Sequence, residues 1–545
     1  MEDTDLIILW GSNAREAHPV MFHHMMKAVR RRGAKLVVVD PRRISGTEFA
    51  SMYLPVNVGG DVALANAVGH VIVEEGLANT EFIEAATDGF DAYRKTVQNY
   101  RPEDVEKLTG VDARLVRQLA RLYATSERAI LCWTLGITEH HNAVQNVHAL
   151  INLGLVTGHV GRYGSGLAPL RGQNNVQGGG DMGALPNRLP GFQNLTDPEI
   201  RKRFSDAWGV AVPEKIGKHQ TAMFEAMAAG EMRALYVIGE NPIQSEANLH
   251  HVRSLFDGLD FLLVQDIFLT PTGERADVVL PATASWAEGM GTVTSSERRV
   301  QRMRPALKPP GEARDDLWIV EELAMRLNAP GGWRHRTAEE TWDELRSLSP
   351  MHRGMSYARL EELGGIQWPC PSEGHPGSPF LHGRLWERPI SGMRAPFVVA
   401  DHEPTAEQVD QDFPFMLTTG RRLAAFNTGV QTRHYAAPRG HHETLEMCSE
   451  DMEALGLEQG DVCRISSRRG ALEVQVTRSR KVHPGLVFMS LNHPDEVATN
   501  LLTLDATDPV AGTAEFKATA VQIERVRAAV PVGHAIREAV DSHHA

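Results

Sequence analysis

One pattern of strands and turns occurs twice along this chain of 545 residues, and it constrains the fold more than any other feature. Each copy has a short apolar strand, a Gly-x-Asn turn, a helix, a second strand followed by an aspartate, and a third strand ending in Leu-Pro. The first copy runs through Leu6–Trp10, Gly11-Ser12-Asn13, a helix over 18–32, Lys35–Val39, Asp40 and Met52–Val56. The second runs through Leu235–Ile238, Gly239-Glu240-Asn241, a helix to about Phe256, Phe261–Gln265, Asp266 and Ala276–Pro281. We interpret the pattern as an internal duplication.

Strand–helix–strand units of this kind build parallel sheets in which all strands end at one edge. A turn glycine at that edge lets a phosphate approach the helix N-terminus, and an acid after the second strand suits a ribose or a base. Each copy is therefore predicted to hold one nucleotide, with Asp40 and Asp266 at the carboxyl ends of their strands. The alternative is two ordinary Rossmann-like units that only fill a doubly wound sheet. As a nicotinamide fingerprint the pattern is weak, because one of three expected glycines is present.

Between the two copies lies a stretch rich in glycine and amides, R-G-Q-N-N-V-Q-G-G-G-D-M-G-A-L-P-N-R-L-P-G-F, over Arg171–Phe192. So many glycines and prolines predict a loop without helix or strand. A solvated surface linker is one reading. However, amide side chains behind an arginine favour a loop around a polar ligand, because the guanidinium fork suits a carboxylate. We expect the guanidinium of Arg171 to be buried.

The composition excludes several classes of protein. The net charge of −13 argues against a nucleic-acid partner, no apolar stretch reaches membrane-spanning length, and the acidic N-terminus does not look like a signal peptide. The four cysteines are too far apart to build a zinc site or an iron–sulfur cluster from nearby ligands. His140 and His141 are interpreted as solvent or loop contacts rather than metal ligands.

The C-terminal part changes character. Short alternating strands at Phe415–Thr418, Asp461–Ser466, Ala471–Thr477 and Val487–Leu491, joined by tight turns, predict a β-barrel. The predicted fold is thus α/β, with two pseudo-repeated Rossmann-like doubly wound units and a C-terminal β-barrel domain. The expected domains are 1–165 (first unit with a helical insertion), 166–330 (the glycine-rich loop and second unit), 331–411 (an irregular connector), 412–526 (the barrel) and 527–545 (a tail).

The motif R-G-Q-N-N-V-Q-G-x-x-D-M-G-x-x-P resembles the active-site loop in the catalytic subunit of molybdenum or tungsten formate dehydrogenases. These enzymes belong to the bis-molybdopterin-guanine-dinucleotide oxidoreductases, the DMSO reductase superfamily. The similarity extends from Asp5 to about Val526. It implies a bis-molybdopterin guanine dinucleotide with molybdenum or tungsten, one nucleotide arm for each copy of the repeat, and Arg171 as the catalytic residue that anchors formate.

The same resemblance assigns the other site residues. They are predicted cofactor contacts: Gly11, Asn13, Asp40, Arg42, Gly60, Asp61, Gly136, Gln173, Gly239, Asn241, Gln265, Asp266, Thr270, Asp277, Thr419, Arg421, Asn500, Phe516 and Lys517. No metal ligand is expected from this chain.

One part of the family pattern is not found. In the family an N-terminal segment carries four cysteines for a [4Fe–4S] cluster and the metal-ligating cysteine or selenocysteine, followed by a histidine. We expect that segment, as an upstream piece or subunit, and electron-transfer subunits as partners, in the cytoplasm. A selenocysteine codon read as a stop, or a split gene, would explain the start at Met1. The alternatives are a molybdoenzyme for another small anion such as nitrate, and a non-catalytic cofactor-binding paralogue.

Overall fold

The computed structural model describes residues 1–423, 425, 427–428 and 442–529. Two compact units are present. Unit 1 comprises Met1–Pro169, Gln244–Val252 and His382–Ala545, and unit 2 comprises Leu170–Ile243 and Arg253–Leu381. Most of the predicted C-terminal tail, residues 530–545, lies outside the described residues. No helix in the described ranges is long and apolar enough to cross a membrane.

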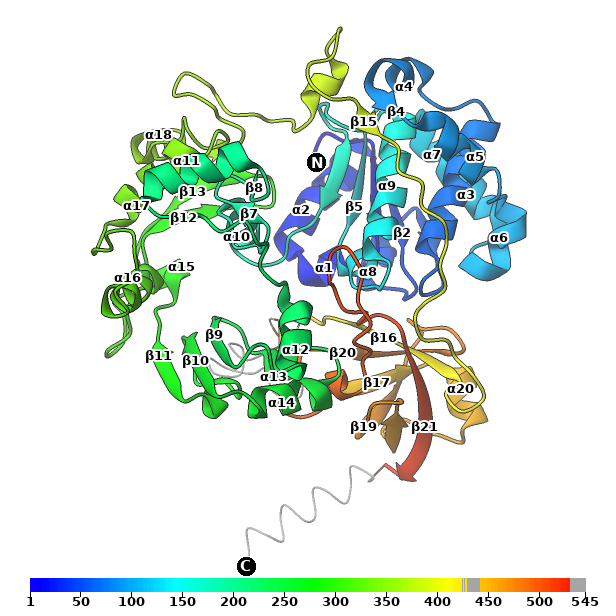
Figure 1. The fold of residues 1–545 in the computed structure, drawn as a ribbon. Coiled ribbons are helices and arrows are strands. Elements are labelled where there is room, and N and C mark those ends of the chain that lie inside the picture. Colours follow the sequence, from blue (N-terminus) through cyan, green and yellow to red (C-terminus); the bar gives the residue numbers. More distant parts are fainter. Residues whose placement is uncertain (424, 426, 429–441, 530–545) are drawn as a thin grey trace, which may run out of the picture. The chain divides into compact units, whose positions relative to one another are not determined.

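Unit 1 is built around a five-stranded parallel sheet in the order β3-β2-β1-β5-β6 (Figure 1, blue to cyan). Its strands are β1 (Leu6–Trp10), β2 (Lys35–Val39), β3 (Met52–Leu54), β5 (Ala129–Trp133) and β6 (Gly166–Pro169). The sheet is central because β1 and β5 are buried along their whole length and belong to one large apolar core. Its helices are α1 (Ala14–Ala17), α2 (Pro19–Lys27), α3 (Asp61–Glu74), α4 (Thr80–Ala86), α5 (Phe90–Val97), α6 (Pro102–Thr109), α7 (Ala113–Thr125), α8 (Leu135–Thr138) and α9 (Ala143–Thr157).

The barrel also belongs to unit 1. Six strands close in the order β16-β20-β17-β19-β18-β21 around an apolar interior. They are β16 (Phe415–Gly420), β17 (Thr444–Met447), β18 (Val462–Ser466), β19 (Ala471–Arg478), β20 (Leu486–Ser490) and β21 (Thr519–Arg527), with helix α20 (Ser449–Ala454) between β17 and β18. Before the barrel, β15 (Ala395–Pro396) pairs with β4 (Thr87–Asp88).

Unit 2 contains the second copy of the repeat. Its parallel sheet has the order β11-β10-β9, formed by β9 (Ala234–Ile238), β10 (Phe261–Asp266) and β11 (Val278–Pro281). Helices α13 (Pro242–Ser245) and α14 (Leu249–Asp257) lie between β9 and β10 in sequence, and the unit boundaries fall within them. The other elements are β7 (Arg188–Leu189), β8 (Gln193–Asn194), α11 (Pro198–Trp208), α12 (Gln220–Ala228), α15 (Ser285–Glu288), β12 (Gly291–Thr294), β13 (Arg299–Met303), α16 (Asp316–Arg326), α17 (Ala338–Leu348), α18 (Tyr357–Glu362) and β14 (Ile366–Gln367).

The two copies of the repeat share strand order and register. Val39 is paired with Trp10 and Leu54, and the equivalent Gln265 is paired with Ile238 and Leu280. The turn glycine is also held alike: the N–H of Gly11 donates to Val39 O at 2.8 Å, and that of Gly239 donates to Gln265 O at 2.8 Å. The predicted α/β fold with parallel sheets and a C-terminal barrel is confirmed.

Two local predictions are wrong. The stretch over 171–192 is not all loop, because Val176–Asp181 forms helix α10 despite its three glycines. The connector expected to be irregular over 331–411 contains α17 and α18, and α17 begins with a capping box between Thr337 and Glu340.

Candidate active site

The carboxyl edge of the first sheet brings most of the unit 1 predictions together. Gly11 follows β1 and Gly136 follows β5, and their backbones touch: Gly136 N–H donates to Gly11 O at 3.1 Å. A Cβ on Gly136 would lie 2.6 Å from the Gly11 backbone, so side chains are excluded there. Next to this contact, the buried atoms Ser12 Oγ and Asn13 Oδ1 have no hydrogen-bond partner among the described residues. Buried polar atoms are normally satisfied, so these two indicate a ligand at this edge.

Two acids at the same edge have perturbed protonation. Burial raises the pKa of Asp40 to about 7, although the Arg42 N–H donates to its Oδ1 at 3.0 Å. Burial also raises the pKa of Asp61, whose Oδ1 accepts from Trp10 Nε1 at 2.8 Å. Asp40 senses the charges of both Asp61 and Lys517. Carboxyl groups with raised pKa values concentrate at functional sites.

The barrel supplies the next group of predicted contacts. Thr419 Oγ1 donates to Phe516 O at 2.8 Å, and Lys517 Nζ donates to Thr419 O at 3.1 Å. Lys517 is buried and forms an ion pair with Glu139 at 2.7 Å. Burial lowers the pKa of Arg421, and Glu139 opposes that shift. These cations therefore lie around one carboxylate of the segment after β5.

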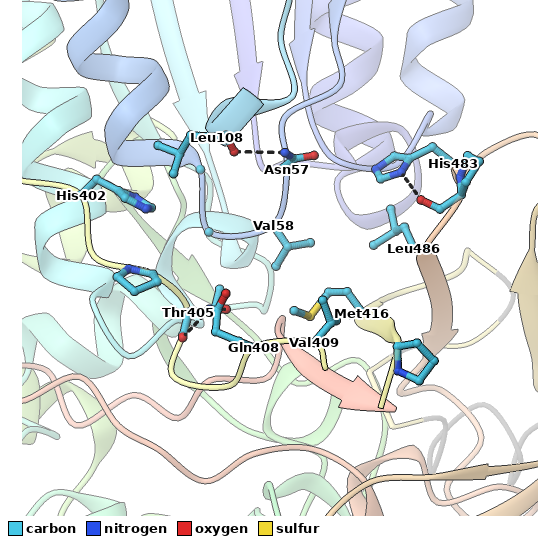
Figure 2. Close-up of a pocket in the computed structure, with 16 residues that line it drawn as sticks. Asn57, Val58, Leu108, His402, Thr405, Gln408, Val409, Met416, His483 and Leu486 are labelled. Atoms are coloured by element: carbon cyan, nitrogen blue, oxygen red, sulfur yellow. Dashed lines mark hydrogen bonds between the residues drawn. The ribbon is translucent and has the colours of Figure 1, made fainter. Parts of the chain in front are cut away.

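Other predicted contacts in unit 1 are engaged within the protein. Arg42 forms a buried bidentate pair with Glu446, at 2.6 and 3.2 Å, and stacks over the Phe488 ring. Asn500 Nδ2 donates to Ser245 O at 2.8 Å. Gly60 precedes α3 and lines a pocket of about 350 Å³ on unit 1. In Figure 2, the pocket wall at Asn57 and Leu108 is closed by a hydrogen bond of 3.0 Å.

The second sheet presents its predicted residues differently. Asn241 Oδ1 accepts from Thr272 Oγ1 at 2.7 Å, Gln265 Nε2 donates to Asp316 Oδ1 at 2.5 Å, and Thr270 Oγ1 accepts from Gly273 N. Asp266 lies at the carboxyl edge, where burial raises its pKa and two backbone N–H groups donate to it. Asp277 lies at the opposite edge, before β11, and accepts from Leu262 N at 2.7 Å. Asp277 is thus separated from the other predicted contacts of this copy.

The glycine-rich loop, in unit 2, presents Arg171 to solvent, so the expectation of a buried guanidinium is wrong. Its Nε donates to Gln177 Oε1 at 3.2 Å, and Gln177 donates in turn to Asp181 Oδ1 at 2.9 Å. Trp368 Nε1 donates to the other oxygen of Asp181 at 2.8 Å. Within the described residues no other hydrogen bond to this guanidinium is found, so both terminal nitrogens remain available to an anion. Gln173 is exposed.

Reasoning from the sequence missed several residues. Asp181 orients Arg171 through Gln177, and burial raises its pKa. His140, interpreted as a loop or solvent contact, is buried against Glu515, which is itself fully buried. The sequence does contain a signal for this pair, because two short segments with charged side chains adjoin apolar strands. Glu139-His140-His141 follows one such strand, and Glu515-Phe516-Lys517 precedes a second. In the described ranges no group of three His, Cys, Asp or Glu side chains could hold a metal ion.

The parallel sheet present in each unit, and the polar atoms at one strand edge that have no partner among the described residues, are typical of a protein that binds a nucleotide cofactor. The model of the molybdopterin oxidoreductase family matches residues 1–326, and that of the molydopterin dinucleotide binding domain matches residues 415–520. This chain belongs to the molybdopterin oxidoreductase family.

Named relatives agree with this assignment. The chain is 39% identical to the F420-dependent formate dehydrogenase 2 subunit alpha of Methanococcus maripaludis over 96% of this chain and 77% of that protein. It is 36% identical to formate dehydrogenase H of Escherichia coli over 96% of this chain and 73% of the relative. Acetylene hydratase from Pelobacter acetylenicus shares the fold, with a TM-score of 0.71 at 19% identity over 96% of this chain and 78% of the hydratase.

The residues present fit the dinucleotide that this family binds. Ser12 Oγ and Asn13 Oδ1 offer unused acceptors, Asp40 offers a carboxyl group that can ionise on contact with a base, and Gly239 faces open space where a side chain would otherwise stand. Ser12, Asn13 and Asp40 would hold one nucleotide arm, together with the barrel residues Thr419 and Lys517. Gly239 and Asp266 would hold the other.

Proposed function

We propose that this chain is the catalytic subunit of a formate dehydrogenase that oxidises formate to carbon dioxide, a proton and two electrons. The observation that supports this proposal most strongly is the hydrogen bonding of the Arg171 guanidinium. Gln177 accepts from its Nε and donates to Asp181, and Trp368 holds Asp181 in turn. Among the described residues the guanidinium is thus oriented without an ion pair to a carboxylate. A fork with two free terminal nitrogens matches the two oxygens of formate. The names of the relatives support the same substrate.

The chain's residues bind and orient in this proposal. When bound, bis-molybdopterin guanine dinucleotide with molybdenum or tungsten supplies the two-electron acceptor. Arg171 holds the two oxygens of formate. The C–H bond of formate therefore points away from the guanidinium. Asp181 keeps Arg171 in place through Gln177; burial raises the pKa of Asp181, although the hydrogen bonds from Gln177 and Trp368 oppose that shift. In this proposal Arg171, Gln177 and Asp181 position the substrate and take no proton from it.

Partners and compartment complete the proposal. We place the electron exit in a [4Fe–4S] segment and in electron-transfer subunits, because within the described residues the four cysteines are isolated and buried. Buried free thiols suit a reducing compartment, which favours the cytoplasm.

The test is Arg171→Lys in the assembled, cofactor-loaded enzyme. A lysine keeps the charge but loses the fork, so the KM for formate is expected to rise at least about tenfold, with a smaller change in kcat. Arg188→Lys is the matched control, because Arg188 stacks on Phe192 in the same loop region and has no assigned role in substrate binding. An unchanged KM in the Arg171 variant would mean that the loop contacts cofactor only.

A further inference from the structure

Two short segments of unit 1, far apart in sequence, carry complementary charges. Glu139-His140-His141 follows α8, and Glu515-Phe516-Lys517 precedes β21. Glu139 pairs with Lys517 at 2.7 Å, while His140 Nδ1 and His141 Nδ1 each lie 3.2 Å from one oxygen of Glu515. We call these five residues, Glu139, His140, His141, Glu515 and Lys517, the charge clamp.

Both ring nitrogens of His140 face hydrogen-bond acceptors. Its Nε2 lies 3.1 Å from the carbonyl oxygen of Gly136, which can only accept, and its Nδ1 faces the Glu515 carboxylate. Burial would raise the pKa of Glu515, but the two histidines outweigh burial and the net shift is downward. His140 therefore joins the Gly136 backbone to the Glu515 side chain through both of its ring nitrogens.

The charge clamp connects the two sources of predicted cofactor contacts. Through Nε2 it holds Gly136, whose backbone rests on Gly11. Through Glu515 it holds Phe516 and Lys517, which bond Thr419. Glu515 also accepts from Ala406 N at 3.1 Å, so its position is fixed from a third side.

We propose that His140 is a positioning residue for the cofactor: its buried pair with Glu515 sets the barrel contacts Phe516 and Lys517 against the carboxyl edge of the first sheet. This inference rests on the proposed cofactor. The groups facing the pair are Glu403, which lies 3.9 Å from His141, together with Asp61, Glu139 and Lys517.

The test compares His140 variants for bound pterin and metal per chain, for the rate of pterin release, and for the melting temperature of the cofactor-free chain. His140→Leu is expected to release pterin about tenfold faster or more, as for other residues that orient a bound group. His140→Lys supplies N–H donors for both partners, the Gly136 carbonyl and the Glu515 carboxylate, and is expected to restore much of the retention. Glu403→Gln is the control: Glu403 is half exposed and lies 3.9 Å from His141, and a glutamine still offers Gln145 an acceptor. Pterin retention and melting temperature are both expected to stay as in the wild type.

A double variant separates positioning from plain stability. Replacing both partners of a buried pair by apolar groups often restores stability, so His140→Leu with Glu515→Leu is expected to regain the melting temperature of the cofactor-free chain. It is not expected to regain pterin retention. Recovery of both properties together, or wild-type retention in His140→Leu, would overturn the proposal. If the wild-type protein itself never binds pterin, the proposed function fails instead.

Discussion

The two copies of the repeat share strand order, register and the bond to the turn glycine, yet they expose different chemistry. In the first copy, the turn after β1 packs on Gly136, and the buried atoms Ser12 Oγ and Asn13 Oδ1 have no hydrogen-bond partner in the part of the chain that the structure describes. In the second, Gly239 faces open space and the side chain of Asn241 is bonded to Thr272. The strands differ as well: β1 is buried throughout, whereas Ile238 in β9 is 47% exposed. A shared backbone therefore does not fix which polar atoms remain available to a ligand.

The largest expected difference concerns the two turn glycines. Gly11→Ala would place a Cβ 2.9 Å from the Gly136 backbone at a φ of +58°, so left-handed strain and overpacking add to about 3 kcal/mol or more of lost stability. Gly239→Ala has a φ of +65° but nothing within 4 Å, so only the strain remains, roughly 1–2 kcal/mol. Urea titrations of the cofactor-free variants measure both. Equal losses would show that the close approach of Gly11 and Gly136 contributes nothing.

The second difference concerns the two acids. Burial raises the pKa of Asp40 from its ordinary value near 4 to about 7, so the folded chain binds a proton that the unfolded chain has released over this range. Stability should therefore fall as pH rises from about 4 to about 7, by on the order of 3 kcal/mol from Asp40 alone.

Asp40→Asn should remove that part of the pH dependence, measured as the difference between wild-type and variant urea titrations at several pH values. The equivalent Asp266 also has a raised pKa, but two backbone N–H groups hold its carboxylate, and Asp266→Asn is the comparison variant. A wild-type curve that runs parallel to the Asp40→Asn curve would contradict the assignment of a raised pKa to Asp40.

The sequence specified the parts of this molecule that depend on local pattern. Strands Leu6–Trp10 and Lys35–Val39 were predicted to the residue, because apolar runs bounded by turn residues are local signals. The contacts that decide which polar side chains remain available to a ligand are not local. Arg42 meets Glu446 across 404 positions, and His140 meets Glu515 across 375. No periodicity in a single sequence reports such pairs.

The same reason explains the error at the glycine-rich stretch. Glycines weaken a helix, but Asp181 is anchored by Trp368, 187 positions away, and Asn175 Oδ1 accepts from Thr294 N at 2.9 Å. Tertiary bonds at both ends of Val176–Asp181 override the local preference. The motif identified Arg171 as a candidate site residue, but it did not predict that the guanidinium is exposed.

The smallest expected effect on stability distinguishes the two turn asparagines. Asn241→Ala would leave the N–H and hydroxyl of buried Thr272 without this acceptor, which costs about 1–3 kcal/mol. Asn13→Ala removes an oxygen that bonds nothing in the described chain, so the cofactor-free protein should keep its stability within about 0.5 kcal/mol.

Pterin retention should show the reverse order. If Asn13 Oδ1 is kept free for the nucleotide, its loss should speed pterin release while Asn241→Ala has the weaker effect on release from a correctly folded chain. Urea titration of the cofactor-free variants and pterin release from the loaded ones give the two rankings independently. Rankings that run in the same direction would mean that Asn13 serves the fold, and the distinction between the two copies at this turn would be lost.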